Sequence, residues 1–201
     1  MKITLLISLL FISISLKAEE KIILAGGCFW CIEAPFYKTP GVISAKSGYI
    51  HGHVKNPTYK QVSSGKTGHI EAVEVIFDEK KIILPQILSI FWQSFDPTDK
   101  GGSFHDRGSQ YTSGVFYFNE KQKKIAEATK TYLSTLKVFN KPVITPIHKA
   151  TKFYYAEDYH QDYHKKNPLR YKYYRYGSGR DKYIEKTWND KKLVFPMSIF
   201  K

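Results

Sequence analysis

Hydrophobic and polar positions along this 201-residue chain follow two different periods, which predicts both strands and helices. Apolar runs and period-two stretches predict strands at residues 21–25, 42–49, 69–78 and 110–118, and short ones at 143–144 and 152–155. Helical patterns predict helices at residues 32–37, 84–95, 120–136, 156–164 and 181–188, and a short one that opens at 56–59 and ends at Gly65.

The order of these elements favours an α+β fold. Strands and helices alternate without the regular spacing of a doubly wound sheet, so we expect a two-layer sandwich with a mixed β-sheet and packed helices. Residues 98–107 form a predicted glycine-rich loop that is too long and polar for a tight hairpin. The tyrosine-rich chain beyond Pro168 is expected to be irregular up to residue 181 and to wrap over the surface as a long C-terminal segment.

The first 18 residues have the composition of a secretory signal peptide. A basic start at Lys2 precedes a nearly unbroken apolar run at residues 3–16, and Ala18 ends a small-x-small cleavage pattern. The apolar run is short for a bilayer span of roughly 20 residues. We therefore predict cleavage, no stable membrane insertion afterwards, and a secreted or periplasmic protein whose single catalytic domain covers residues 19–201.

The chain is basic, with a formal net charge of +13 that falls to +11 when Lys2 and Lys17 are removed. Such a charge attracts anionic surfaces. The lysines are scattered, however, and export argues against nucleic acid as a partner. We therefore interpret most of the charge as a solvated face and expect a monomer, because nothing indicates an extended interface.

The only two cysteines lie in the segment Gly26-Gly27-Cys28-Phe29-Trp30-Cys31, between a predicted strand and a predicted helix. Glycine permits a sharp turn there, and the start of a helix favours a thiolate at Cys28. Cys31 follows one helical turn later, within disulfide reach if the backbone allows it. The pair could instead be small buried hydrophobes. Zinc would need two further ligands, and no second cysteine pair exists, so we expect no metal.

Two further features bear on chemistry. The alternating pattern places Glu71 on the same strand face as Val73, Val75 and Phe77, either at a strand end in water or in a dry pocket that raises its pKa. The second option is what a general acid requires. His160 and His164 are four residues apart, but the zinc-protease pattern between them fails, which argues against a metal there.

Five sequence blocks, in order, resemble the A-type peptide methionine sulfoxide reductases. They lie at residues 27–30, 57–59, 68–73, 106–111 and 153–160, so the resemblance covers nearly all of the chain after residue 18. It implies an α+β sandwich that reduces methionine S-sulfoxide, free or in proteins, and so repairs oxidised proteins. A thiolate attacks the sulfoxide sulfur and leaves methionine and a cysteine sulfenic acid.

The resemblance also implies a role for each matching residue. Cys28 is the nucleophile and Glu71 the acid that protonates the sulfoxide oxygen. Tyr59 and Tyr111 would hydrogen-bond to the same oxygen. Phe29 and Trp30 would form a slot for the methyl group of the substrate. Asp106 would hold the backbone amide of the substrate.

The chain departs from the family pattern at Cys31, where many relatives carry glycine, and in lacking cysteines near the C-terminus. The resemblance then implies that Cys31 is the internal candidate to resolve the sulfenic acid as a Cys28–Cys31 disulfide, or that it is merely structural. Turnover would need no bound cofactor, but it would need an external thiol, either thioredoxin-like or a dithiol. The block at residues 177–181 also resembles relatives without late cysteines, and its role stays open.

Two other functional classes compete with this interpretation. A thioredoxin-like thiol-disulfide oxidoreductase has the right cysteine spacing, but it leaves Glu71, Tyr59 and Tyr111 unexplained. A basic, tyrosine-rich module that binds the cell envelope would fit the charge and the C-terminal tyrosines, but it ignores the ordered blocks.

Overall fold

The computed structural model describes residues 19–189 and 191–200, so the predicted signal peptide at residues 1–18 lies outside the described residues. A six-stranded sheet in the order β7-β6-β1-β3-β2-β8 forms the centre. Its pairs are antiparallel except β6 with β7, which are parallel, so the sheet is mixed as predicted. The strands are β1 (Glu19–Gly26), β2 (Val42–Ile50), β3 (Ile70–Asp78), β6 (Ser113–Tyr117), β7 (Ile147–Lys149) and β8 (Tyr154–Tyr155).

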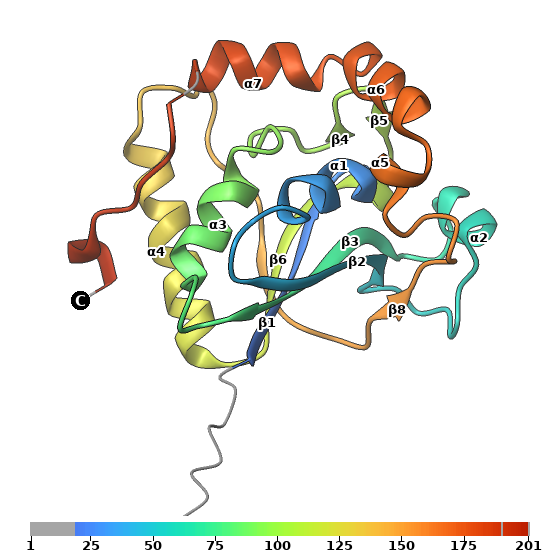
Figure 1. Ribbon diagram of the computed structural model, residues 1–201, viewed down its shortest axis with the longest axis horizontal. Helices are drawn as coiled ribbons and strands as arrows, with labels where there is room; N and C mark the ends of the chain where they lie inside the picture. The colour runs from blue at the N-terminus through green and yellow to red at the C-terminus, as the bar shows by residue number, and fades with distance from the viewer. Residues whose placement is uncertain (1–18, 190, 201) are drawn as a thin grey trace, which may run out of the picture.

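Helices pack on this sheet and complete the predicted α+β sandwich (Figure 1). The α-helices are α1 (Phe29–Glu33), α2 (Tyr59–Ser63), α3 (Leu84–Trp92), α4 (Glu120–Thr135), α5 (Tyr163–Lys166), α6 (Pro168–Gly177) and α7 (Arg180–Trp188). Three 3₁₀ turns accompany them, namely η1 (Ala34–Phe36), η2 (Ser109–Tyr111) and η3 (Met197–Phe200). None of the helices in the described part of the chain is both long and apolar enough to cross a membrane.

Local sequence explains where the helices begin. Thr58 and Gln61 form a capping box at the start of α2, and the Asn119 side chain accepts a hydrogen bond from the Gln122 N–H at the start of α4. Pro85 lies in the first turn of α3, where its missing N–H has no helical partner to lose.

The main hydrophobic core lies between the sheet and the pair α3 and α4. The apolar face of β3, which carries Val73, Val75 and Phe77, packs with α3 residues such as Phe91 in this core. A smaller cluster on the other face of the sheet includes Phe116 and is closed by the chain around residues 150–153. The larger core fixes β1 and β3 side by side, and these two strands carry the predicted nucleophile and the predicted acid to the same end of the sheet.

Three local predictions are wrong. The strand predicted at 143–144 forms at β7, three residues later. The loop at 98–107 contains a minimal hairpin, β4 (Gly102–Ser103) with β5 (Asp106–Arg107), turned by a left-handed Phe104. Residues 156–164 are mostly turn, because the Gln161 amide pairs with the Ser47 backbone at the sheet edge and so prevents a continuous helix.

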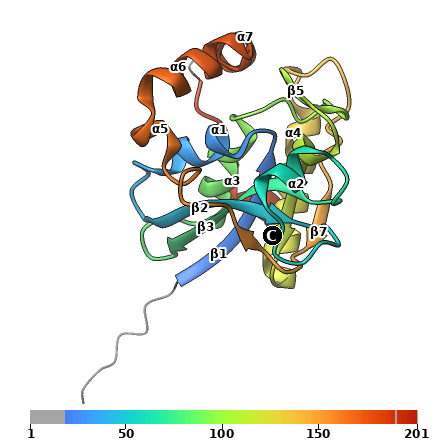
Figure 2. The ribbon, with the colours of Figure 1, turned by 90° about the vertical axis from the view of Figure 1, so that its right-hand side faces the viewer.

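The C-terminal segment is also more regular than predicted. Helix α6 occupies residues that the sequence left irregular, because Pro168 stands at its first turn and the chain continues without a break to Gly177. Helix α7 confirms the helix predicted at 181–188. Figures 1 and 2 show α5, α6 and α7 lying against the end of the sheet where α1 begins.

Candidate active site

The cysteine-bearing turn joins the end of β1 to the start of α1. Gly27 has φ +89°, and a Cβ there would lie 2.3 Å from the Ser103 Cβ, so this position needs glycine for both backbone conformation and space. Cys28 is the residue that caps α1. The Cys31 N–H donates to the Cys28 carbonyl at 3.0 Å, which stacks the two cysteines within one turn.

Both cysteines are buried free thiols. Burial raises the pKa of the Cys28 thiol well above its usual value. The pKa of Cys31 is lowered to about 6, first because the Cys28 thiol points its hydrogen at the Cys31 sulfur and then because Arg180 and Arg175 lie near. The two sulfur atoms therefore share a hydrogen bond, and the cations on α6 and α7 favour a negative charge on the pair.

That the start of the helix favours a thiolate at Cys28 itself stays a prediction. Helix α1 has only five residues, and the N–H of Phe29 donates at 3.0 Å to the Glu71 Oε2. The carboxyl group thus takes the hydrogen bond that the sequence pattern assigned to the cysteine.

Glu71 lies in the dry pocket that was one of the two predicted options. Its residue surface is 2% exposed, and it shares the core face of β3 with Val73 and Val75. Burial raises the pKa of Glu71 to about 8, although the Phe29 N–H works in the opposite direction, while the charge of Asp106 adds to the rise. At neutral pH this carboxyl group therefore keeps its proton and can donate it.

Two tyrosines lie beside the carboxyl group. Tyr59 begins α2 and stacks on Phe29 with ring centroids 6.5 Å apart, and Tyr111 ends the 3₁₀ turn η2. Burial raises the pKa of Tyr59 to about 12, and burial followed by the charge of Glu71 raises the pKa of Tyr111 further. Both hydroxyl groups remain protonated at neutral pH, so they can donate hydrogen bonds to an oxygen near Glu71.

The aromatic residues that follow Cys28 form a wall. Phe29 is buried, whereas Trp30 is partly exposed and stacks on Tyr163 with centroids 3.7 Å apart and planes 5° apart. The Trp30 indole N–H donates to the His160 Nδ1 at 3.2 Å. Burial lowers the pKa of His160 to about 4, so the ring is neutral and its nitrogen is free to accept. His160 thus orients the Trp30 ring.

Glu157 is a second residue from the same C-terminal block whose role the sequence did not reveal. Its carboxylate accepts the Tyr59 N–H at 2.8 Å and the Tyr49 hydroxyl at 2.9 Å. Although burial works to raise its pKa, these hydrogen bonds outweigh burial and lower it. Glu157 therefore anchors the start of α2 and positions Tyr59.

Tyr174 of α6 is a site residue that the sequence analysis missed. Its hydroxyl group donates a short hydrogen bond to the Asp106 carboxylate and lies close to the Cys28 thiol. Its ring meets Trp30 edge-on, with centroids 5.7 Å apart. The sequence does contain a signal for the helix that carries Tyr174, because a proline and a glycine, Pro168 and Gly177, stand at the start and end of a ten-residue segment, as is typical of helices.

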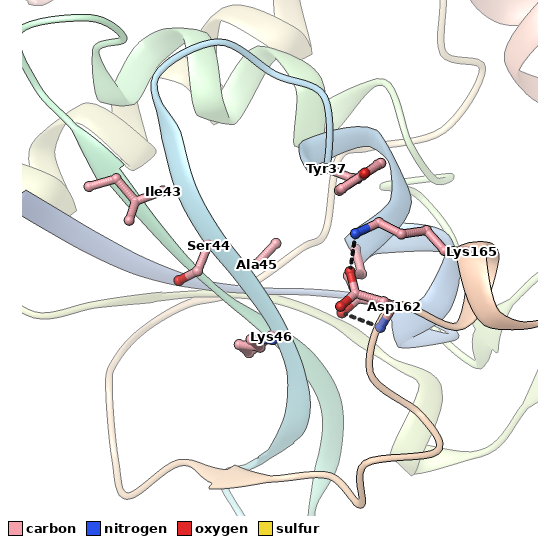
Figure 3. Close-up of a pocket in the computed structure, with 8 residues that line it drawn as sticks. Tyr37, Ile43, Ser44, Ala45, Lys46, Asp162 and Lys165 are labelled. Carbon is pink, nitrogen blue, oxygen red and sulfur yellow. Dashed lines mark hydrogen bonds and ion pairs between the residues drawn. The ribbon is translucent and has the colours of Figure 1, made fainter.

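A separate cavity of about 250 Å³ lies beside α1 and is lined by neither cysteine (Figure 3). Glu33 is buried there. One carboxylate oxygen of Glu33 accepts the Asp162 N–H at 3.2 Å, and the other has no partner among the described residues. Burial raises the pKa of Glu33 to about 7. Among residues 19–189 and 191–200 no cluster of three or more His, Cys, Asp or Glu side chains could hold a metal ion.

Comparison with known proteins gives one consistent family. Residues 20–192 match the family described as peptide methionine sulfoxide reductase. Peptide methionine sulfoxide reductase MsrA 2 of Staphylococcus aureus is 52% identical over 172 residues, which is 86% of this chain and 97% of that protein. Peptide methionine sulfoxide reductase MsrA of Bacillus licheniformis is 48% identical over 175 residues, which is 87% of this chain and 97% of that protein.

Solved structures show the same fold. The crystal structure of Mxr1 from Saccharomyces cerevisiae in reduced form has a TM-score of 0.66 at 32% identity, covering 75% of this chain and 87% of that one. Methionine sulfoxide reductase A of Corynebacterium diphtheriae has a TM-score of 0.65 at 31% identity, covering 75% and 76%.

Proposed function

Because this chain belongs to the MsrA family and is a peptide-methionine (S)-S-oxide reductase, we propose that Cys28 is its nucleophile and Glu71 its general acid. The observation that carries the proposal is the Phe29 N–H bond to Glu71 at 3.0 Å, which places a buried carboxyl group one residue from Cys28. A sulfoxide sulfur becomes electrophilic when its oxygen is protonated. The raised pKa of Glu71, about 8, supplies that proton at neutral pH.

Neighbouring residues hold the substrate in this scheme. Tyr59 and Tyr111 donate hydrogen bonds to the sulfoxide oxygen, since both hydroxyl groups stay protonated. The methyl group lies in a slot between Phe29 and Trp30. Asp106, whose carboxylate is held by Tyr174, accepts the backbone N–H of the oxidised methionine. A slot and a fixed cluster of donors on opposite sides of sulfur suit one sulfoxide epimer.

The reaction then runs in two steps. Cys28 attacks the sulfoxide sulfur, the oxygen passes to Cys28 as a sulfenic acid, and methionine leaves. Cys31 next attacks the Cys28 sulfur, forming a disulfide and releasing water. Overall one sulfoxide and two thiols give one methionine, one disulfide and one water, so the sulfoxide gains the two electrons that the thiols lose. The one-turn spacing of the cysteines supports this resolving role.

An external thioredoxin-like thiol would return the enzyme to its reduced state. A Cys28–Cys31 disulfide would have no further cysteine in this sequence to reduce it, because the sequence contains only two cysteines. The apolar run at residues 3–16 supports export to the periplasm or the outside, where the enzyme would repair oxidised proteins.

Intact mass spectrometry after a single turnover tests the mechanism. The reduced chain from residue 19 is mixed with N-acetylated methionine S-sulfoxide without other reductant. We expect one methionine per enzyme, loss of two hydrogens, and a Cys28–Cys31 peptide on mapping. A gain of one oxygen without a disulfide would remove Cys31 as the resolving cysteine. Methionine formation by a Cys28→Ser variant at the parent rate would overturn the assignment of the nucleophile.

A further inference from the structure

Arg180, the first residue of α7, is a buried cation behind the cysteine-bearing turn. Its residue surface is 1% exposed. The guanidinium donates to the Gly26 carbonyl at 3.3 and 3.4 Å, to the Ser94 carbonyl at 2.5 Å, and to the Ser103 hydroxyl at 3.3 Å. It also lies over the Phe104 ring, 4.8 Å from the centroid. One side-chain group thus ties α7 to β1, to the turn that follows α3, and to β4.

This charge has no carboxylate partner among residues 19–189 and 191–200. Within the part of the chain that the structure describes, Arg180 forms no ion pair, and its Nε has no hydrogen-bond partner. Arg175 of the neighbouring α6 differs, because its Nε bonds to Asp181 at 2.6 Å. A buried charge without a counter-charge is strongly destabilising, and carbonyl oxygens compensate for it only in part. A compensating negative charge is therefore expected close to Arg180.

The cysteine pair can supply that charge. A Cβ on Gly27, the residue before Cys28, would lie 3.1 Å from the Arg180 Nη2, so the guanidinium touches the turn itself. The lowered pKa of Cys31 has the Cys28 thiol as its first cause, and Arg180 is the largest contribution from a cation, ahead of Arg175. A pair that holds one proton and one negative charge would place the compensating charge beside Arg180.

We propose that Arg180 is a positioning residue that keeps the Cys28–Cys31 pair singly deprotonated and so sets the pH range of both chemical steps. The proposal rests on the proposed function of the two cysteines. When Cys28 attacks the sulfoxide, its proton passes to the Cys31 sulfur, so the thiolate already present serves as the base. In the second step that proton leaves with the sulfenic acid oxygen as water, while Cys31 forms the disulfide bond.

Three substitutions at one position separate charge from structure. Arg180→Gln and Arg180→Met remove the charge, and the methionine can still pack against Phe104. Arg180→Lys keeps the charge with fewer hydrogen bonds. Two readouts are followed against pH, namely the ultraviolet absorbance of the thiolate and the rate of disulfide formation after one turnover. An opposite charge within ~4–6 Å shifts a pKa by about one unit or more. Removing the charge should therefore slow disulfide formation about tenfold at pH values between the thiolate midpoint of the parent and that of the neutral variant.

The expected pattern is specific. Both charge-removing variants should move the thiolate midpoint to higher pH, and Arg180→Lys should stay near the parent. Arg175→Gln is the matched control and should shift the midpoint less, because Asp181 already offsets that charge. Folding of every variant is checked by thermal melting.

The inference is overturned if Arg180→Gln or Arg180→Met folds and keeps the parent midpoint, because Arg180 would then be only a structural tie. It is also overturned if Arg180→Lys shifts the midpoint as far as the neutral variants do. If the parent enzyme forms methionine but no disulfide, the proposed resolving role of Cys31 is wrong. The thiolate absorbance would still test Arg180 in that case.

Discussion

Glu71→Gln is the substitution that tests the acid most directly. Glutamine keeps nearly the same shape and can still accept the Phe29 N–H, but it cannot protonate the sulfoxide. The pKa of Glu71, about 8, lies about 3.5 units above the ordinary value of 4.5. That difference corresponds to about 5 kcal/mol between the two protonation states. At pH 7 about nine in ten Glu71 side chains are thus protonated, against about one in 300 for an unperturbed carboxyl group.

The assay is the single-turnover rate of methionine formation from a peptide S-sulfoxide, measured from about pH 6 to about pH 10. The parent rate should fall with increasing pH above about 8, because Glu71 then loses its proton. General acid catalysis contributes about a hundredfold to ten-thousandfold. Glu71→Gln should lose a factor in that range, and its residual rate should show no fall above pH 8.

Glu74→Gln is the matched control. Glu74 is a second buried carboxylate on β3, but it bonds to Lys21 and Tyr155, away from the cysteines. This variant should keep the parent rate and pH profile. The reasoning is refuted if folded Glu71→Gln retains more than about a tenth of the parent rate, since a general acid is worth far more than tenfold. A fall above pH 8 in Glu71→Gln that matches the parent would refute it as well.

Three further substitutions test other parts of the structure. Tyr174→Phe removes the hydroxyl group that holds Asp106, so KM for a peptide sulfoxide should rise about tenfold or more in steady-state kinetics, with the fold intact. Glu33 has its pKa raised by burial to about 7, so its contribution to stability is complete below about pH 4.5 and is lost as pH rises to about 7. Glu33→Gln should therefore remove a decline of about 3 kcal/mol between those pH values in urea unfolding. Phe91→Ala should cost about 3–5 kcal/mol in the same measurement, because Phe91 is fully buried in the main core.

Local sequence patterns predicted much of the fold and part of the site. The hydrophobic run before Gly26 and the alternation around Glu71 placed β1 and β3 correctly, because a buried strand face leaves a direct mark on the sequence. The same alternation left Glu71 either at a strand end in water or in a dry pocket, and the packed structure places it in the pocket. The sequence did not reveal that the Phe29 N–H donates to a carboxyl group 42 residues away, because that contact forms only in the folded chain. Nor did it reveal the raised pKa of the Cys28 thiol, whose first cause is burial.

The C-terminal helices were hidden for a related reason. Helix α6 buries no residue completely, and its large side chains are tyrosines and basic residues apart from one leucine, so it lacks an apolar stripe of the kind that predicts a helix. Helices α6 and α7 are instead held in place by contacts with residues far away in the sequence. Tyr174 reaches an aspartate 68 positions earlier, and Arg180 of α7 reaches Gly26 across 154 positions.

These contacts explain how a short C-x-x-C segment can work without a longer helix behind it. Helix α1 is too short to stabilise a thiolate by itself, and its free N–H serves Glu71. The positive charge therefore has to come from another part of the chain, and α6 and α7 bring Arg175 and Arg180 to the pair. Arg175 is paired with Asp181, whereas Arg180 has no ion-pair partner among the described residues, so we expect the larger effect on the cysteines from Arg180. The segment that the sequence predicts to be irregular thus brings two cations close to the cysteine pair.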